Sequence, residues 1–266
     1  MFSVIYYFSG TGNSLAVARK INEKLTEKSE IVSIPTIGIP TIGGKLAIKA
    51  DRVGFVFPVY IHKAPDIVKR CIANIEFLSS PYIFAVATHN GEPGRSLLEI
   101  QELLAGKGQL LSLASAIAMP GNAFETDPDT ELERLSASEQ SVSEIANLIE
   151  SQKEGGIDGE YGFIKKIRSR IVGFVAWNYE FSPKRFRVSN DCEGCRSCEK
   201  LCPVHNIHLV DHRPEWKKKC TACLACFHWC PKEAISMNNF YIKKRRKYRH
   251  PEISIQDMVV ANSSPE

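Results

Sequence analysis

Short apolar runs alternate with helical patterns over residues 1–150 of the chain. The runs are rich in β-branched residues, which indicates buried strands, whereas the segments between or after them have the length and periodicity of helices. The predicted strands are residues 3–9, 30–34, 52–60, 82–88 and 110–120, and the predicted helices are residues 13–27, 64–75, 94–106 and 129–153.

This alternation predicts an α/β fold with a parallel sheet. Continuous apolar strands that are joined by helices of about 10 to 15 residues are typical of sheets covered on both faces. Because crossover connections are right-handed, the pattern favours a doubly wound, five-stranded parallel sheet. Such sheets bind ligands at the carboxyl ends of their strands, where the strand order reverses, so we expect a site at that edge.

A Gly-rich stretch, residues 153–160, ends the last predicted helix and indicates a domain boundary. The chain then divides into a first domain at residues 1–154, a linker with a bridging helix at 155–187, a cysteine-rich domain at 188–240 and a basic polar tail at 241–266. Within the linker, residues 161–181 combine apolar and basic positions. A helix that bridges the domains is the favoured interpretation, and a basic amphipathic contact with a membrane surface is the alternative.

The nine cysteines are concentrated in one part of a chain of otherwise ordinary composition. Eight of them fall between residues 192 and 230, so the thiols indicate a local site and not a disulfide framework that extends over the whole protein. The first ten residues lack the pattern of a signal peptide, and no apolar run approaches the roughly 20 residues of a spanning helix. We therefore expect a cytoplasmic protein in a reducing compartment, where clustered cysteines bind metal or do redox work more often than they form disulfides.

Charge is divided unevenly along the chain. Residues 1–150 have a net charge of −4, whereas residues 151–266 have a net charge of +8. The basic run KKRRKYRH, residues 243–250, is read most simply as a solvated tail. Its favoured functional interpretation is docking to an acidic redox partner, ahead of binding to nucleic acid or to an anionic membrane.

Two cysteine motifs repeat with an offset of 28 residues. The pattern Cys-x-x-Cys-x-x-Cys-x-x-x-Cys-Pro begins at Cys192 and again at Cys220. The first three thiolates of such a motif can surround one face of a 4Fe-4S cluster, while the fourth cysteine serves the other cluster. The expected ligand sets are Cys192, Cys195, Cys198 and Cys230 for one cluster, and Cys220, Cys223, Cys226 and Cys202 for the second.

Zinc is the competing metal for these thiols, because it also binds four thiolates. Zinc sites usually pair one Cys-x-x-Cys with another some way off and have no use for a third, equally spaced cysteine or a trailing Cys-Pro. Since eight cysteines complete two clusters, the nearby histidines are expected at the surface or in packing: His205, His208, His212 and His228. The stretch closely resembles a bacterial-type two-cluster ferredoxin domain, whose clusters would also stabilise a segment too short to bury its own core.

The stretch FSGTGNS, residues 8–14, is a glycine turn between a predicted strand and a predicted helix, where exposed amides can hold a phosphate. It lacks the lysine that a Walker loop has after Gly12, and Leu15 stands where a dinucleotide-binding fingerprint needs glycine or alanine. The remaining hydroxyl-rich loop resembles the flavodoxin phosphate loop. The resemblance implies that the phosphate of FMN is bound by Ser9, Gly10, Thr11, Gly12, Asn13 and Ser14.

Two later loops follow the third and fourth predicted strands, where flavodoxin-like proteins hold the flavin ring. By this resemblance Tyr60, beside Pro58 and Val59, is the aromatic expected to stack on the ring, and the alternative is an ordinary aromatic at a strand end. Contacts to the polar edge of the ring are expected from the backbone around Thr88, His89, Asn90 and Gly91.

Over nearly its whole length the chain resembles the EFR-type ferredoxin family, in which a flavodoxin-like domain is fused to a C-terminal two-cluster ferredoxin domain. The resemblance implies a flavodoxin-like sheet of strand order 2-1-3-4-5 and a small α+β two-cluster domain. It also implies an electron-transfer protein that passes electrons between FMN and two 4Fe-4S clusters, and so exchanges one- and two-electron traffic with redox partners. The alternative is a flavoenzyme that reduces a small organic substrate beside residues 120–127, Tyr60 and His62.

Overall fold

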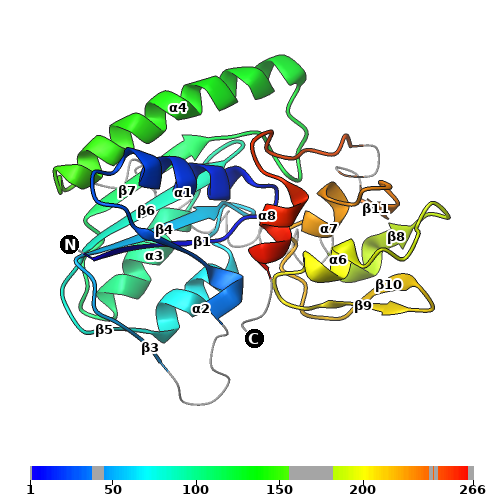
Figure 1. Cartoon of the computed structure of the whole chain (residues 1–266), viewed down its shortest axis with the longest axis horizontal. Coiled ribbons are helices and arrows are strands. Elements are labelled where there is room, and N and C mark those ends of the chain that lie inside the picture. The colour runs from blue at the N-terminus through cyan, green and yellow to red at the C-terminus, as the bar shows by residue number, and fades with distance from the viewer. Residues whose placement is uncertain (1, 38–44, 156–181, 240–241, 243–244, 263–266) are drawn as a thin grey trace, which may run out of the picture.

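The structure, a computed structural model, describes residues 2–37, 45–155, 182–239, 242 and 245–262 (Figure 1). Its larger part is an α/β domain around one parallel sheet. The strands of this sheet are β1 (Ser3–Tyr7), β2 (Glu30–Ser33), β4 (Arg52–Pro58), β6 (Tyr82–His89) and β7 (Leu113–Ala118), in the order β2-β1-β4-β6-β7. Counted along these five strands alone, this is the order 2-1-3-4-5 of flavodoxin-like proteins, which confirms the predicted fold class of the domain.

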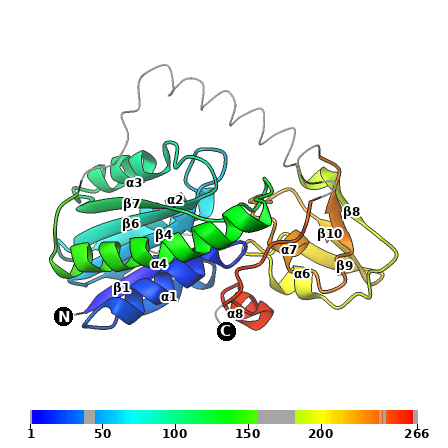
Figure 2. The same ribbon diagram turned by 90° about the horizontal axis from the view of Figure 1, so that it is seen from above.

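The two faces of the sheet are each covered by a pair of helices (Figure 2). The pair α1 (Asn13–Lys24) and α4 (Pro128–Glu150) lies on one face, and the pair α2 (Asp66–Asn74) and α3 (Ser96–Ala105) lies on the other. All four were predicted from their pattern. No helix within the described residues is both long enough and apolar enough to cross a membrane.

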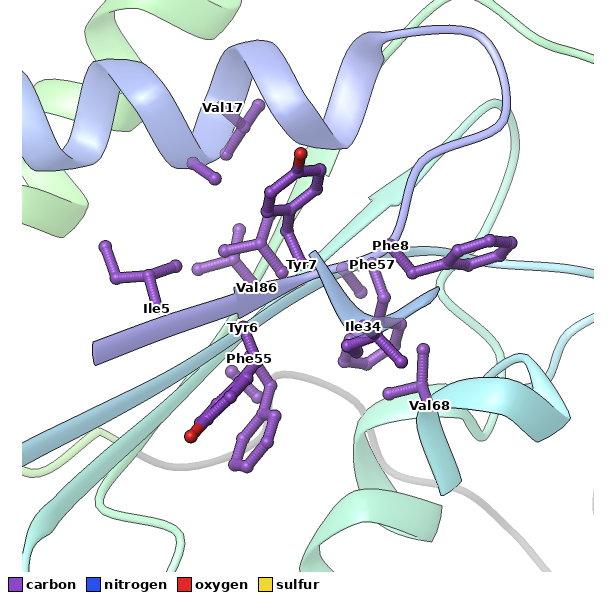
Figure 3. Packing of buried hydrophobic residues seen from close by; sticks show 14 of the residues in the cluster. Ile5, Tyr6, Tyr7, Phe8, Val17, Ile34, Phe55, Phe57, Val68 and Val86 are labelled. Atoms are coloured by element: carbon purple, nitrogen blue, oxygen red, sulfur yellow. The ribbon is translucent and has the colours of Figure 1, made fainter. Parts of the chain in front are cut away.

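The core of the α/β domain is apolar on both faces of the sheet. Figure 3 shows Tyr6 and Phe55 on one side and Tyr7 on the side of α1. The rings of Tyr6 and Phe55 stack with their centroids 5.8 Å apart. At Gly54 a Cβ would lie 2.2 Å from Cζ of Phe84, so this ring packs directly on the backbone of β4. Apolar burial of this kind contributes about 25 cal/mol per Å² and depends on no cofactor.

The cysteine-rich region is built from much shorter elements. Strand β8 (Phe186–Val188) pairs with β11 (Ile235–Met237), and β9 (Ile207–Val210) pairs with β10 (Arg213–Trp216), both antiparallel. The third cysteine of each motif lies in a single-turn helix, α6 (Ser197–Lys200) or α7 (Ala225–His228). A third short pair, β3 (Leu46–Ile48) with β5 (Ile75–Phe77), belongs to the α/β domain. None of these strands was predicted, because three or four residues are too few to show a period.

Residues 245–262, which we call the C-terminal strap, pack against the α/β domain and include α8 (Ile255–Val260). The expectation of a solvated basic tail is wrong for these residues, because Arg245, Tyr248 and His250 are each at most 8% exposed. Figures 1 and 2 show α8 at the junction of the α/β domain and the cysteine-rich region. The domain limits drawn from the sequence stay predictions, and the bridging helix expected within residues 161–181 lies outside the described residues.

Candidate functional site

A cavity of about 310 Å³ opens where β1, β4 and β6 end, at the edge where the strand order reverses. The structure brings nearly all of the residues predicted to bind flavin to this cavity. Its walls include Ser9, Gly10, Thr11, Asn13, Ser14, Pro58, Val59, Tyr60, Thr88, His89, Asn90 and Gly91. Gly12 is the exception, because it faces the C-terminal strap. The volume is in the range of small-molecule and cofactor sites.

The glycine loop presents a helix N-terminus to this cavity. Gly12 has a φ of 100°, a left-handed conformation that glycine adopts without strain, and its N–H donates to Oγ of Ser9 over 3.1 Å. Helix α1 begins at Asn13 with no side chain capping its first amides and no acidic residue in its first turn. Uncapped amides and the positive end of the helix dipole fit an anion, so the loop suits a phosphate group.

A strained turn forms the wall after β4. Tyr60 and Lys63 exchange backbone hydrogen bonds of 3.0 and 3.1 Å around Ile61 and His62, whose φ angles are 50° and 61°. Positive φ is unusual for a β-branched residue and costs on the order of 1–3 kcal/mol. The N–H of Arg95 donates to the carbonyl of His62 over 2.8 Å and helps to hold the turn. Strain that the surrounding structure maintains is typical of functional sites.

Tyr60 lies between the cavity and the cysteine-rich region. Its ring packs edge-on against Phe8 with the centroids 6.1 Å apart, and its hydroxyl is buried without a hydrogen-bond partner among the described residues. Burial, followed by the neighbouring Cys223 and Cys220, raises the pKa of Tyr60 well above its usual value, so the hydroxyl stays protonated and can donate. An unpartnered buried hydroxyl is costly, and a bound group that accepts from it would remove that cost.

The third wall is the loop after β6, where Asn90 is held by partners from the loop after β7 and from α4. Arg134 donates through Nη1 to Oδ1 of Asn90, and Thr126 donates to the same oxygen over 3.2 Å. At Gly121 a Cβ would lie 2.4 Å from Nδ2 of Asn90, so only glycine allows this close approach. Next to Asn90, burial lowers the pKa of His89, which favours its neutral form.

The eight clustered cysteines line two separate pockets in the cysteine-rich region. One pocket is lined by Cys192, Cys195, Cys198 and Cys230, and the other by Cys202, Cys220, Cys223 and Cys226. We call these the first and the second thiol pocket. Each pocket combines three cysteines of one motif with the fourth cysteine of the other, which is the grouping that the spacing predicted. Whether these thiols bind iron stays a prediction.

The two motifs also repeat in backbone conformation. Left-handed residues occur in pairs separated by the same 28 positions, namely Gly194 and Ala222, Arg196 and Leu224, and His205 and Glu233. Helices α6 and α7 are related by the same offset. A sequence repeat that is also a conformational repeat indicates two equivalent binding loops.

The surroundings of the sulfur atoms suit thiolate ligands. The N–H of Asn206 donates to Sγ of Cys202 over 3.1 Å, and the N–H of Ala222 donates to Sγ of Cys220 over 3.4 Å. Burial raises the pKa of Cys223 to about 12, although a backbone N–H from Ala225 acts in the opposite direction. Buried thiols of this kind become thiolates when a cation binds them, and amides directed at sulfur tune the potential of iron-sulfur clusters.

All nine cysteines are free, including the buried Cys71, and no three His, Cys, Asp or Glu side chains among the described residues converge as ligands of a single metal ion.

The second thiol pocket adjoins the cavity directly. Ala222, between two cysteines of that pocket, is part of the cavity wall. A Cβ on Gly10 would lie 2.5 Å from the carbonyl oxygen of Cys223 and 2.9 Å from the hydroxyl of Tyr60. The indole N–H of Trp229 donates to the carbonyl of Gly10 over 3.0 Å. The glycine loop and the second cysteine motif are therefore in contact although they are far apart in the sequence.

Sequence reasoning expected His228 at the surface or in packing, and it missed that this residue joins these parts. His228 is completely buried and contacts the carbonyl of Asn122 through Nε2 at 2.9 Å, so it ties α7 to a loop of the cavity. The C-terminal strap was missed altogether. Its one sequence signal is the pattern Ser254-x-x-Asp257, which forms a complete capping box at the start of α8.

Comparison with known proteins gives partial likenesses. No family model matches the chain. One component of an ion-translocating oxidoreductase complex from Methanosarcina acetivorans is 45% identical over 47 residues, which are 17% of this chain and 18% of that protein. The chain therefore matches less than a fifth of that relative's length.

Among solved structures, an FMN-dependent NADH-azoreductase from Bacillus anthracis in complex with FMN is 12% identical, with a TM-score of 0.40 over 56% of this chain and 99% of the other. The two-electron reduced flavodoxin of Megasphaera elsdenii is 16% identical, with a TM-score of 0.36 over 53% of this chain and 99% of the other. Likeness of this degree carries no argument about function. The flavodoxin-like class of the α/β domain rests on its own strand order.

Proposed function

We propose that this chain is an electron-transfer protein of the EFR-type ferredoxin kind, with FMN in the cavity and one 4Fe-4S cluster in each thiol pocket. One observation carries the proposal: the second thiol pocket shares a wall with the cavity, where Gly10 meets Cys223 and Ala222 lies between two of the pocket's cysteines. Redox groups held on the two sides of such a wall would exchange electrons across it without a mobile carrier.

The chain's own residues would bind the flavin in three places. The amides that begin α1 and the hydroxyls of Ser9, Thr11 and Ser14 fit the phosphate, and the walls at Tyr60 and at residues 88–91 fit the ring. When bound, FMN accepts electrons in pairs or singly whereas each cluster passes one at a time, so the protein can convert between the two kinds of traffic. The cavity wall keeps water away on the cluster side, because Tyr60 is only 8% exposed.

The two thiol pockets differ in exposure, which suggests the order in which electrons pass between the redox groups. Cys195 of the first pocket is exposed and Cys192 is half-buried, whereas Cys223 and Cys226 of the second pocket are buried beside the cavity. A partner protein would therefore exchange electrons at the first pocket, and the second pocket would connect it to the flavin. The same order serves traffic in either direction.

A flavoenzyme is the second candidate, supported by the exposed side of the cavity. Phe124 lines the cavity and is 51% exposed, and the strained turn at Ile61 and His62 forms another part of its wall. An apolar side chain and a strained turn beside a flavin site are features that a small organic substrate could use. In that case the clusters would only supply electrons to the flavin.

Anaerobic purification with flavin extraction and iron analysis tests the proposal. We expect about one FMN and about eight irons per chain, since two 4Fe-4S clusters contain eight. A colourless protein that contains zinc and no flavin would contradict it. A stopped-flow experiment then separates the two candidates: the electron carrier reacts quickly with protein acceptors, whereas the flavoenzyme is reoxidised quickly by one small substrate and slowly by such acceptors.

A further inference from the structure

The C-terminal strap contacts three parts of the molecule around the proposed phosphate site. It reaches the glycine loop, the loop after β7 and the second cysteine motif through separate hydrogen bonds. Its basic side chains are used within the chain. Arg245 donates to the carbonyl of Gly121, Lys247 donates to the carbonyl of Ile235 over 2.7 Å, and Arg249 donates to the carbonyl of His228 over 2.7 Å. For this reason we do not assign the strap as a docking surface for a partner.

Tyr248 makes the contact that matters most for the phosphate loop. Its hydroxyl donates to Oδ1 of Asn13 over 2.7 Å, while Nδ2 of Asn13 donates to the carbonyl of Pro120 over 2.9 Å. Both side chains are buried. Asn13 is the first residue of α1 and lines the cavity, so these two bonds fix the side chain that stands at the helix N-terminus.

The backbone of the strap supports the same loop from outside. The N–H of His250 donates to the carbonyl of Thr11 over 2.9 Å. A Cβ on Gly12 would lie 2.9 Å from Cβ of His250 and 3.0 Å from Cβ of Ile253, so the strap packs tightly on the left-handed glycine. The conformation that directs the loop amides at the cavity is thus held by a segment more than 230 positions away in the sequence.

The strap also connects the loop to the second cysteine motif. The N–H of Tyr248 donates to Nδ1 of His228 over 3.0 Å, so the proton of this ring lies on Nε2, which donates to the carbonyl of Asn122. Tyr248 therefore binds Asn13 with its side chain and His228 with its backbone. One residue links the phosphate loop, the second cysteine motif and the loop after β7.

We propose that Tyr248 is a positioning residue for flavin phosphate: acting through Asn13, it holds the glycine loop in its phosphate-binding conformation before the ligand arrives. This inference rests on the proposed function, because it assumes that the ligand is a flavin with a phosphate monoester. A loop ordered in advance binds more tightly, since the entropy of ordering it is not lost on binding. The benefit is specific to the phosphate, because the walls that fit the ring lie elsewhere.

The variant Tyr248→Phe keeps the ring and removes only the hydroxyl. Asn13 then loses the partner of its buried oxygen, and the expected tenfold change in affinity corresponds to about 1.4 kcal/mol. We expect the dissociation constant for FMN to rise about tenfold, whereas the constant for riboflavin, which lacks the phosphate, stays unchanged. Both constants are measured by flavin fluorescence on iron-loaded protein.

Tyr82→Phe is the matched control. The hydroxyl of Tyr82 also donates to one protein oxygen, the carbonyl of Lys153, over 2.8 Å, but at the amino end of β6. This variant should leave the ratio of the two constants at its wild-type value. The proposal is overturned if Tyr248→Phe leaves the ratio of the FMN and riboflavin constants at its wild-type value. This includes a variant that binds both flavins equally more weakly, because that result indicates general unfolding. A wild-type protein that binds neither flavin would contradict the proposed function itself.

Discussion

The α/β domain and the cysteine-rich region are stabilised in different ways. The domain buries large side chains on both faces of a five-stranded sheet, and Phe8, Phe55, Phe57 and Phe84 are all completely buried. The core of the cysteine-rich region consists of Phe227, a few other apolar side chains and the cysteines Cys198, Cys202, Cys226 and Cys230. Its sheets have two strands each. A segment of this size rarely folds on apolar burial alone, so a metal bound by the thiols, as we propose, would be part of its core.

The largest difference between the two regions should appear when iron is removed anaerobically with a chelator. We expect backbone amides of β8–β11 to lose their protection from hydrogen exchange, because metal binding is folding free energy in small metal-binding domains. Amides of β1, β4 and β6 should keep theirs, since apolar packing holds that sheet. Mass spectrometry measures the exchange. Equal protection of β8–β11 with and without iron would show that the region folds without metal.

Single cysteine variants test how the thiols are divided between the pockets. Cys198→Ala should remove the cluster of the first pocket and Cys202→Ala that of the second, although both residues belong to the first motif. Each variant should retain about four of about eight irons, with different signals lost in electron paramagnetic resonance. Cys71→Ala is the control, because this buried thiol lies in α2 and should leave the iron content unchanged. If both motif variants lose the same signal, the pairing is within motifs and our assignment is incorrect.

A change in the sheet should lower the stability of the α/β domain and leave the iron content unchanged. Gly54→Ala places a Cβ at 2.2 Å from the ring of Phe84, and overpacking of this kind costs about 1–3 kcal/mol of unfolding free energy. Phe84→Leu in the same chain should recover part of that loss, because the smaller side chain makes room. Denaturant unfolding measures both effects, and iron per chain should stay at the wild-type value. Strict additivity of the two changes would contradict the packing described for this pair.

The smallest effect concerns the end of the C-terminal strap. Asp257 accepts from Ser254 at the N-terminus of α8 and from Arg19 of α1, and these hydrogen bonds hold its pKa at about 2, below its usual 3.8. The stabilisation that these hydrogen bonds give the folded protein is therefore fully present above pH 3.8 and is lost as the pH falls through about 2. At neutral pH, Asp257→Ala should cost about 1 kcal/mol, seen as faster hydrogen exchange in α8. Unchanged exchange there would show that packing alone holds the strap.

The sheet and the thiol pockets could be predicted because each has a local signal. Buried parallel strands are apolar throughout, and cluster-type cysteines have a fixed spacing, so both are visible in short windows of sequence. The edge of the sheet that holds the cavity followed from the order of strands, because the carboxyl ends of parallel strands meet at one edge, whereas the residues of the cavity were named from the resemblance to flavodoxin-like proteins. These predictions needed no knowledge of which distant segments touch.

The C-terminal strap could not be predicted because its contacts are with segments that are distant in the sequence. Arg245, Lys247 and Arg249 look like solvated cations in the sequence, but carbonyl groups from three distant segments accept their hydrogen bonds. Helix α8 has six residues, too few for a hydrophobic period. The contact of Gly10 with Cys223 is likewise long-range, and no pattern within either segment indicates it.

The central claim is that flavin phosphate and the second thiol pocket are neighbours. Phosphorus NMR of bound FMN tests it directly, because a paramagnetic cluster broadens the resonance of a nearby nucleus. On full reduction we expect the phosphorus line to broaden in the wild-type protein and in Cys198→Ala, and to stay sharp in Cys202→Ala. A line that stays sharp in wild-type protein loaded with FMN and about eight irons would contradict the claim.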